Sequence, residues 1–292
     1  MRIAAEVEQA VAERVRHGTG AGTRARVLAS GDGWTVTDLI CTSGPQDRPF
    51  EESHDYYSIA LVTAGTFQYR ASRGEALLSP GSIMLGNAGQ CFECGHEHAA
   101  GDRCLAFLYA PKFFEQVAAD VGVRRRSLEF DAVSIPSVKE FSPLASQGCA
   151  GLLGASTVDW QEMSLSIAGH ALRMAAGLTT DAIPPGAAER VSRVVRVIEH
   201  DLDGELTLDR LANESHLSAF HFLRTFERIT GLTPHRYILR ARLRDAAMRL
   251  ESEDRRVLDI ALDCGFGDVS NFNRAFRAEF GVSPRAYRRS RS

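Results

Sequence analysis

The sequence predicts an α+β protein of two domains, an antiparallel β-barrel with associated helices followed by a domain made only of helices. The length of 292 residues suffices for two domains of ordinary size. Short β-rich runs fill residues 34–110, and a helical repeat fills the last third of the chain. The paired prolines and the glycine of TTDAIPPGAAER indicate a linker between the two parts. The predicted domains are therefore residues 1–180 and 187–292.

The composition is that of a globular protein outside the membrane, with 44% hydrophobic and 24% charged residues. No apolar run approaches the roughly 18 residues that span a bilayer. The first residues, MRIAAEVEQAVAERVRHG, carry acidic side chains within an apolar pattern and predict an amphipathic helix, not a signal peptide. We therefore expect a cytoplasmic protein with no membrane partner. In that reducing compartment we expect free thiols, and the isolated Cys41, Cys149 and Cys264 are predicted to pack in cores.

Six runs of β-forming residues predict the barrel. They are WTVTDLICTS, YYSIALVTAG, TFQYRAS, EALLSPGSIMLG, CFECGHEH and RCLAFLY. Turn signals every 8 to 12 residues or so are typical of antiparallel sandwiches and barrels, not of βαβ units. Residues 111–122 then change to helical spacing, with Pro111 in the first turn.

A longer helix is predicted at residues 160–178. Its apolar stripe recurs at helical spacing. The stripe consists of Met163, Ile167, Ala171 and Met174. It could pack on the barrel of the same chain or on a second subunit, and the sequence alone leaves both open.

An internal repeat with a period of 50 residues predicts the fold of the C-terminal domain. Phe222, Arg224, Phe226, Gly231, Pro234 and Tyr237 recur as Phe272, Arg274, Phe276, Gly281, Pro284 and Tyr287. Each copy reads as a short helix, a turn and a longer helix, with Thr207, Ser218 and Asp268 as N-caps and Gly265 in the second turn. Residues 234–249 should form one connecting helix about 24 Å long.

The second copy, GFGDVSNFNRAFRAEFGVSPRAYR, resembles the signature of the AraC/XylS transcriptional regulators, and residues 187–289 resemble their double helix-turn-helix domain. The resemblance implies a sequence-specific regulator that binds double-stranded DNA with the start of each second helix in the major groove. By position, the DNA-binding residues would be Phe220, His221, Leu223 and Arg224 in the first unit and Val269, Ser270, Asn273 and Arg274 in the second.

The side chains at these positions suit base recognition. Arg224 could read guanine and Asn273 adenine, while Leu223 could contact a thymine methyl group. Phosphate contacts or surface salt bridges remain the alternative for Arg224 and Arg274. Residues 187–292 carry 19 basic residues, all arginine, against 16 acidic ones, whereas residues 1–186 carry 15 and 21. The surplus alone is weak evidence for a nucleic acid.

The β-rich part resembles the family's cupin-like sensor and dimerisation domain in architecture only. The resemblance implies a homodimer, with the helix at residues 160–178 as the seam and with Ile167 and Met174 in it. It also implies a small effector of unknown identity. RNA polymerase is a further candidate partner, although no residue pattern indicates where it would bind.

The stretch CFECGHEHAAGDRC, from Cys91 to Cys104, holds three cysteines and two histidines. Strand alternation would place Cys94, His96 and His98 on one face. If AAG forms a three-residue hairpin with Gly101 left-handed, Cys104 lies opposite His96 and joins them. This quartet would suit Zn²⁺ or another transition metal, with Cys91 as an alternative ligand.

Two other interpretations of the stretch stay open. It could be a reactive thiol sensor activated by Arg103 and the histidines, or inert lining of a pocket that includes His54 and Cys91. The function favoured is a regulator whose N-terminal domain senses a metal, a thiol-reactive species or a small molecule through residues 91–104, and which is not an enzyme. The alternatives are a cupin-type metalloenzyme or a cysteine that accepts alkyl groups, either one fused to a DNA-binding domain.

Overall fold

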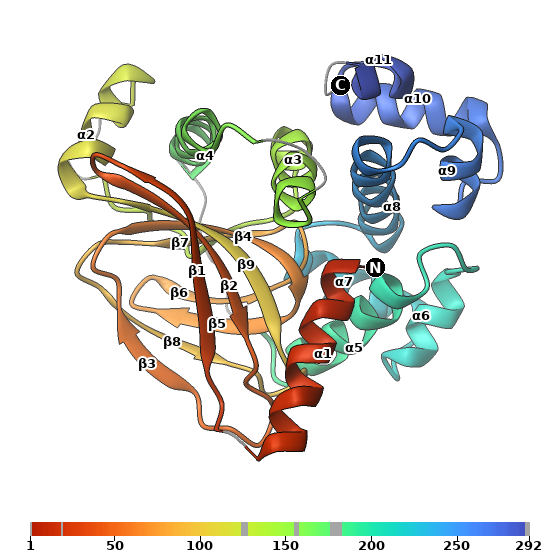
Figure 1. Cartoon of the computed structure of the whole chain (residues 1–292). Helices are drawn as coiled ribbons and strands as arrows, with labels where there is room; N and C mark the ends of the chain where they lie inside the picture. Colours follow the sequence, from red (N-terminus) through yellow and green to blue (C-terminus); the bar gives the residue numbers. More distant parts are fainter. Residues whose placement is uncertain (1, 19, 124–127, 155–157, 176–182, 290–292) are drawn as a thin grey trace.

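The structure is a computed structural model in which a β-barrel with helices leads into an all-helical domain, which confirms the predicted fold class (Figure 1). It describes residues 2–18, 20–123, 128–154, 158–175 and 183–289, without the side chains of Arg2 and Phe220. Within these ranges no helix is long and apolar enough to cross a membrane. Part of the predicted linker, residues 179–182, lies outside the described residues, and the helix that follows begins at Ala187.

Two antiparallel sheets face each other in the N-terminal domain. The larger has the order β1 (Thr23–Gly31), β2 (Trp34–Cys41), β9 (Asp102–Tyr109), β4 (Tyr57–Gly65), β7 (Ile83–Gly86) and β10 (Ser134–Ile135). The smaller has the order β3 (Phe50–Ser53), β8 (Cys91–Gly95), β5 (Phe67–Ala71) and β6 (Gly74–Leu78). The run EALLSPGSIMLG therefore forms two strands in different sheets, joined by a turn in which Ser82 donates a hydrogen bond to the Ser79 carbonyl.

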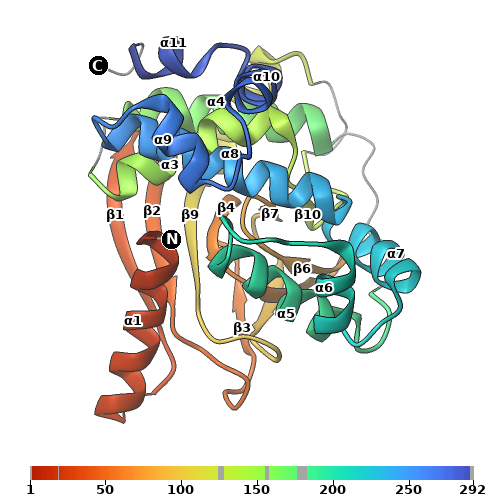
Figure 2. The same ribbon diagram turned by 90° about the vertical axis from the view of Figure 1, so that its right-hand side faces the viewer.

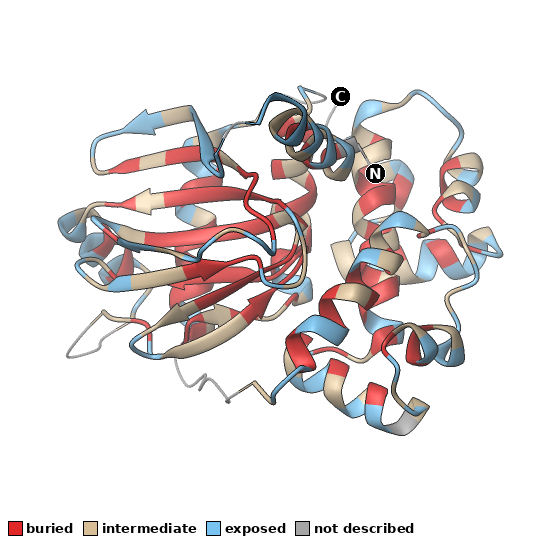
Figure 3. Ribbon diagram, turned by 90° about the horizontal axis from the view of Figure 1, so that it is seen from below, coloured by how far each residue is buried: buried red, intermediate tan, exposed pale blue. Residues whose placement is uncertain are grey.

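The central strands of the larger sheet are buried on both faces, whereas the edge strand β1 is largely exposed. In the central strands, alternation decides which residue faces which layer. Leu105 and Phe107 of β9 belong to the main core beneath the helices. Cys104 and Ala106, which alternate with them along the strand, belong to a smaller core that faces the second sheet. Figure 3 shows the buried residues concentrated along these strands.

Helices cover the outer face of the larger sheet. They are α2 (Pro111–Asp120), α3 (Ser142–Leu152) and α4 (Trp160–Ala175), with a 3-10 turn at Lys139–Phe141 and with α1 (Arg2–His17) along one end of the barrel. The stripe on α4 packs inward: Met163, Ile167 and Ala171 are each at most 2% exposed, and Met174 packs against the same core. The prediction that Ile167 lies in a dimer seam is therefore wrong, because its own chain buries it.

The C-terminal domain contains two helix-turn-helix units, as the repeat predicts. Its helices are α5 (Ala187–His200), α6 (Leu208–Glu214), α7 (Ala219–Thr230), α8 (Pro234–Ser252), α9 (Val257–Asp263), α10 (Val269–Phe280) and α11 (Pro284–Arg289). Helix α8 is shared: Tyr237 and Ala241 pack with α5 to α7, whereas Ala246 and Leu250 pack with α9 to α11. Its 19 residues give it a length of roughly 28 Å.

The two domains are in close contact through α8, which lies beside α3 (Figure 2). Tyr237 donates a hydrogen bond to the carbonyl of Pro80 at 3.4 Å, and Arg244 donates to the same carbonyl at 3.2 Å. Gly231 leaves no room for a side chain because its Cβ would lie 2.5 Å from Pro136. The barrel and the C-terminal helical domain are thus tied together by side chains that are mostly buried.

Candidate functional site

The second helix of each helix-turn-helix unit is capped at the predicted residue. The Ser218 hydroxyl accepts from the His221 amide at 3.4 Å, and the Asp268 carboxylate accepts from the Asn271 amide at 2.7 Å. In both helices paired phenylalanines, Phe222 with Phe226 and Phe272 with Phe276, are buried. The opposite helix face is left for a partner.

The predicted DNA-binding residues lie mainly on that outer face. His221 and Arg224 on α7, and Ser270, Asn273 and Arg274 on α10, are exposed. Leu223 and Val269 are half-buried, so they present less surface. The side chain of Phe220 lies outside the described residues. Arg274 donates to Asn271 at 3.2 Å, which holds its guanidinium on the surface of α10.

A second site lies inside the barrel, where a cavity of ≈ 450 Å³ opens between the two sheets. Most of its wall is apolar, and Leu39, Phe67 and Phe92 are typical. One polar end is formed by Cys41, Cys94, His96, Asp102 and Cys104. Elsewhere in the lining, residues 52–55 add Glu52, Ser53, His54 and Asp55.

The predicted hairpin in CFECGHEHAAGDRC does not form. Strand β8 pairs with β3 and β5, whereas β9 pairs with β2 and β4, so residues 96–101 cross from one sheet to the other. Gly101 is left-handed as expected, at φ 75°, but its amide donates to the Ser43 carbonyl at 2.8 Å and not across a hairpin. The prediction that Cys104 lies opposite His96 is therefore wrong. The residues directly opposite Cys104 on the neighbouring strands are Leu39 and Val62.

The crossover brings together a different set of residues. Cys94, His96 and Cys104 face the cavity, but His98 does not line it. The His98 ring lies 3.8 Å from Glu97, and its carbonyl accepts from Arg196 of α5 at 3.2 Å. The quartet predicted to bind metal is thus broken at His98, because the chain leaves the strand after Gly95 and alternation no longer applies.

Cys91 does not lie where it was predicted, as an alternative metal ligand in the pocket. It begins β8 as an exposed residue opposite Ser53 and does not line the cavity. His54 does line it, and its Nε2 lies 2.8 Å from the Tyr69 hydroxyl while its ring stacks on Phe92. Burial lowers the pKa of His54 to about 4, so this ring is neutral near pH 7.

Cys41, His96 and Asp102 form the tightest cluster of potential ligands within the described ranges. One donor atom from each lies within 4.8 Å of the others, and all three residues are buried. Cys41 and Asp102 are directly paired in the ladder of β2 and β9, so they share a face. His96 Nε2 lies 2.6 Å from Asp102 Oδ1, while His96 Nδ1 is buried without a hydrogen-bond partner.

The charges of this cluster depend on one another. Burial lowers the pKa of His96, but Asp102 and Cys41 outweigh it and raise that pKa to about 10. Burial acts to raise the pKa of Cys41, yet the neighbouring His96 lowers it overall. Burial raises the pKa of Cys94 and of Cys104, and the nearby Asp102 raises both further. These two cysteines are therefore neutral thiols near pH 7.

Sequence reasoning missed Cys41 and Asp102. The isolated Cys41 is predicted to pack in a core, and Asp102 is not among the predicted site residues. One signal was present: Asp102 is two residues from Cys104, so both belong to the same face of one strand. The partner of that strand could not be read from the sequence.

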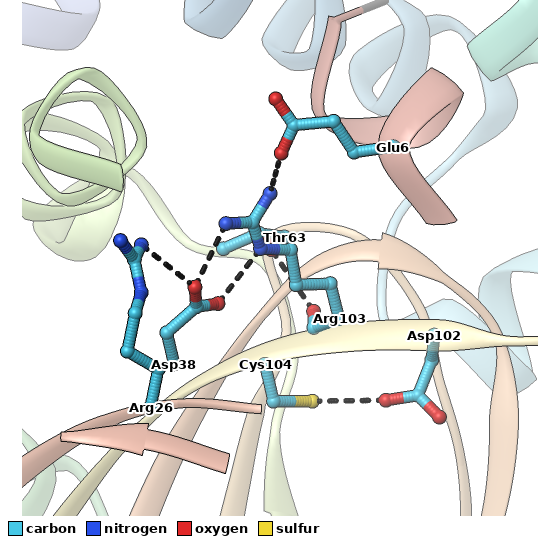
Figure 4. Close-up of polar contacts among 7 residues, drawn as sticks. All are labelled: Glu6, Arg26, Asp38, Thr63, Asp102, Arg103 and Cys104. Atoms are coloured by element: carbon cyan, nitrogen blue, oxygen red, sulfur yellow. Dashed lines mark hydrogen bonds and ion pairs between the residues drawn. The ribbon is translucent and has the colours of Figure 1, made fainter. Parts of the chain in front are cut away.

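The opposite face of β9 leads to the DNA-binding domain. Figure 4 shows Arg103 directed away from Asp102 and Cys104, toward Asp38 and Glu6. Arg103 Nε donates to Asp38 at 2.7 Å, and its guanidinium is 3% exposed. Glu6 belongs to α1, and Glu8 on the same helix lies 2.9 Å from His200 at the end of α5. The cavity wall is thus linked to α5 through α1.

Comparisons with known proteins match both domains. Residues 38–176 match the AraC-like ligand binding domain, and residues 211–290 match a helix-turn-helix domain. The transcriptional activator NphR of Rhodococcus sp is 31% identical over 261 residues, which cover 82% of this chain and 71% of NphR. The HTH-type transcriptional activator RhaS of Citrobacter koseri is 28% identical over 260 residues, 85% of this chain and 90% of RhaS. The DNA-binding domain of AdpA, solved in complex with a target DNA, is 30% identical over 35% of this chain and 91% of its own, with a TM-score of 0.34.

Proposed function

This chain belongs to the AraC/XylS family of DNA-binding transcriptional regulators, with an N-terminal ligand-binding domain, and we propose that the effector it senses binds in the barrel cavity. One observation carries the proposal. The loop of residues 96–101 contributes His96 to the polar end of the cavity and contacts α5 through the bond from Arg196 to the His98 carbonyl. An occupant of the cavity that moves this loop would change how the DNA-binding domain is held.

The cavity lining indicates the class of effector. Its walls are largely apolar, with one set of polar groups at the Cys41, His96 and Asp102 end and another contributed by Glu52, His54 and Asp55. Such pockets bind a mostly apolar molecule and fix its orientation through a few polar contacts. We propose a small, largely apolar molecule whose polar head group lies at the Cys41, His96 and Asp102 end.

The recognition helices α7 and α10 are proposed to read base edges in neighbouring major grooves. Arg224 has the geometry for guanine and Asn273 for adenine, and both are exposed. Adjacent major-groove segments on one face of DNA repeat about every 34 Å. The roughly 28 Å length of α8 is compatible with engaging two of them if the DNA bends slightly.

We propose that the protein acts in the cytoplasm as a homodimer, by binding and not by turnover. The edge strand β1, which leaves Val27 61% exposed, is a candidate contact for a second copy because unpaired edges readily pair with other strands. The relatives NphR and RhaS are named as activators. By analogy we propose that this chain also activates transcription and contacts RNA polymerase.

Selection of DNA sites from a random pool by the purified full-length protein tests the function. We expect an enriched sequence with two elements about one helical turn apart, and Arg224→Ala should select a sequence that is relaxed at the position this side chain reads. Enrichment of no sequence would contradict the proposal. A reporter gene behind a promoter that carries the selected site then measures the transcriptional response in cells. Light scattering of the purified protein measures its oligomeric state.

A matched pair of variants tests the role of the cavity. Leu39→Trp places bulk in the cavity, and Leu165→Trp places the same bulk on the exposed face of α4. We expect only Leu39→Trp to abolish regulation of the promoter while both variants still bind the selected DNA. Normal regulation by Leu39→Trp would show that the effector binds elsewhere.

A further inference from the structure

We propose that Cys41, His96 and Asp102 bind a divalent transition-metal ion of the zinc class, with one coordination position open to the cavity. The proposal deepens the sensing role given to the cavity and rests on it for its consequence, although metal binding itself can be measured independently. Three elements supply the ligands. They are the end of β2, the crossover loop and the start of β9.

The fold itself brings these groups together. Cys41 and Asp102 are opposite each other in the ladder, where paired residues on one face have Cβ atoms roughly 5 Å apart. His96 comes from the loop that precedes β9 and returns onto the same end of the cavity. Donor atoms from all three lie within 4.8 Å of one another, a spread that small side-chain rotations can close around one ion.

The state of His96 indicates that a partner is missing. Its side chain is 1% exposed and Nε2 is 2.6 Å from Asp102, whereas Nδ1 makes no hydrogen bond of ordinary geometry, although Cys41 is close enough to shift the pKa of the ring. A buried polar atom without a partner is unfavourable, and in most proteins it is satisfied by protein, water or an ion. The ring lines the cavity, so an ion held between it and Cys41 would remove this deficit.

The donor set selects the kind of metal. Thiolate, imidazole and carboxylate together suit zinc and its neighbours, whereas calcium and magnesium prefer oxygen ligands alone. Coordination requires a neutral imidazole, and the divalent ion would then supply the positive charge that compensates a buried thiolate and carboxylate. Cys94 and Cys104 border the cluster as neutral thiols and complete the wall.

Three protein ligands leave a position for an exogenous one, as in zinc sites that bind small molecules. This position would face the apolar cavity. The effector class then narrows to a molecule with an apolar body and one metal-binding head, such as a thiol, a carboxylate or a hydroxyl group. Binding at the ion would act directly on His96, the first residue of the crossover loop, and on Asp102, which follows the loop at the start of β9.

Metal titration of the full-length protein, stripped with a chelator under reducing conditions, tests the site. We expect one equivalent of Zn²⁺, and Co²⁺ in its place should give a thiolate charge-transfer band. Cys41→Ser should lose that band. His96→Gln and Asp102→Asn should each weaken the affinity for the metal ion by at least roughly 10-fold to 100-fold. Cys91→Ser, which removes an exposed cysteine outside the cavity, should bind Co²⁺ like the wild type.

Alkylation of the wild-type protein gives a second measurement that does not depend on the folding of a variant. Mass spectrometry after iodoacetamide treatment should show Cys41 modified in the stripped protein and protected by Zn²⁺. Failure of the wild type to bind one equivalent of metal ion, or a charge-transfer band retained by Cys41→Ser, would overturn the proposal. Selection of DNA sites is scored separately, so a protein that selects DNA but binds no metal refutes the metal site alone.

Discussion

Arg240 of α8 and Glu279 of α10 form an ion pair 3.1 Å long that is almost completely buried. Arg240 also donates to the backbone carbonyl of Ser137, and Glu279 accepts from the hydroxyl of Ser142. Both serines belong to the N-terminal domain. The end of the second recognition helix is therefore fixed to α8 and to the ligand-binding domain by one pair of charges.

Arg240→Ala should strongly destabilise the protein, because it leaves Glu279 buried without its cation. Breaking a buried pair from one side costs about 3–5 kcal/mol of unfolding free energy. Urea denaturation of the full-length chain measures this. Arg236→Ala, four residues earlier on the exposed face of α8, is the matched control and should change stability by less than about 0.5 kcal/mol. Equal effects of the two substitutions would show that the pair contributes nothing specific.

Arg224→Ala should weaken binding to the selected DNA site mainly at particular base pairs. Loss of a bidentate contact to guanine removes about 1–3 kcal/mol of discrimination at that position. Fluorescence anisotropy with single-base variants of the site, at several salt concentrations, measures this. A uniform loss on every sequence, with a salt slope smaller by about one, would instead show a phosphate contact.

The control for this substitution uses an arginine that is also exposed but lies outside the recognition helices. Arg73 is on the barrel, where it pairs with Glu129 at 2.6 Å. Arg73→Ala should bind every DNA variant as the wild type does. A similar loss there would indicate a general effect of charge and not a contact at Arg224.

The helical domain could be predicted closely because its signals are local. Caps such as Ser218 and Asp268 and the paired phenylalanines act within one or two turns of helix, so the repeat contained them. Helix α5 was not predicted as such, nor were β1, β3 and β10. The last two are short strands of four and two residues, for which alternation gives little signal.

The barrel site could not be predicted from the sequence because it depends on which strands pair. Cys94 and His96 both line the cavity as predicted, although His96 lies beyond the end of β8, where alternation does not apply. The partner of Cys104 was predicted by assuming a hairpin. The structure pairs β9 with β2 instead, over 60 residues away in the chain, and so brings in Cys41. Long-range pairing of this kind is set by packing of the two sheets, not by any local residue pattern.

Ile167→Asp should prevent folding of the N-terminal domain, and should not simply separate a dimer. Ile167 is 1% exposed in the core under the sheet, so a buried charge there has no partner. Thermal unfolding should show a loss of several degrees or no folded protein. Leu165→Asp on the same helix, where Leu165 is 41% exposed, should keep the wild-type melting temperature within a few degrees. A folded monomer from Ile167→Asp would restore the dimer-seam interpretation.

His54 should make the protein less stable as the pH falls from 7 to 5. Burial holds the pKa of His54 at about 4 in the folded protein, against about 6.5 for an ordinary histidine. The unfolded chain therefore binds a proton between these values and the folded chain does not, so stability is complete above pH 6.5 and is lost as pH falls toward 4. The expected loss at pH 5 is about 2 kcal/mol.

Urea denaturation at pH 7 and pH 5 measures this difference, and His54→Gln isolates it. Glutamine can keep a hydrogen bond to the Tyr69 hydroxyl but does not titrate, so the variant should lose less stability on acidification than the wild type. Gly86 gives a further check, because its Cβ would lie 2.3 Å from the His54 ring. Gly86→Ala should displace the ring and shrink the pH-dependent difference. An identical loss in wild type and His54→Gln would assign the acid sensitivity to other groups.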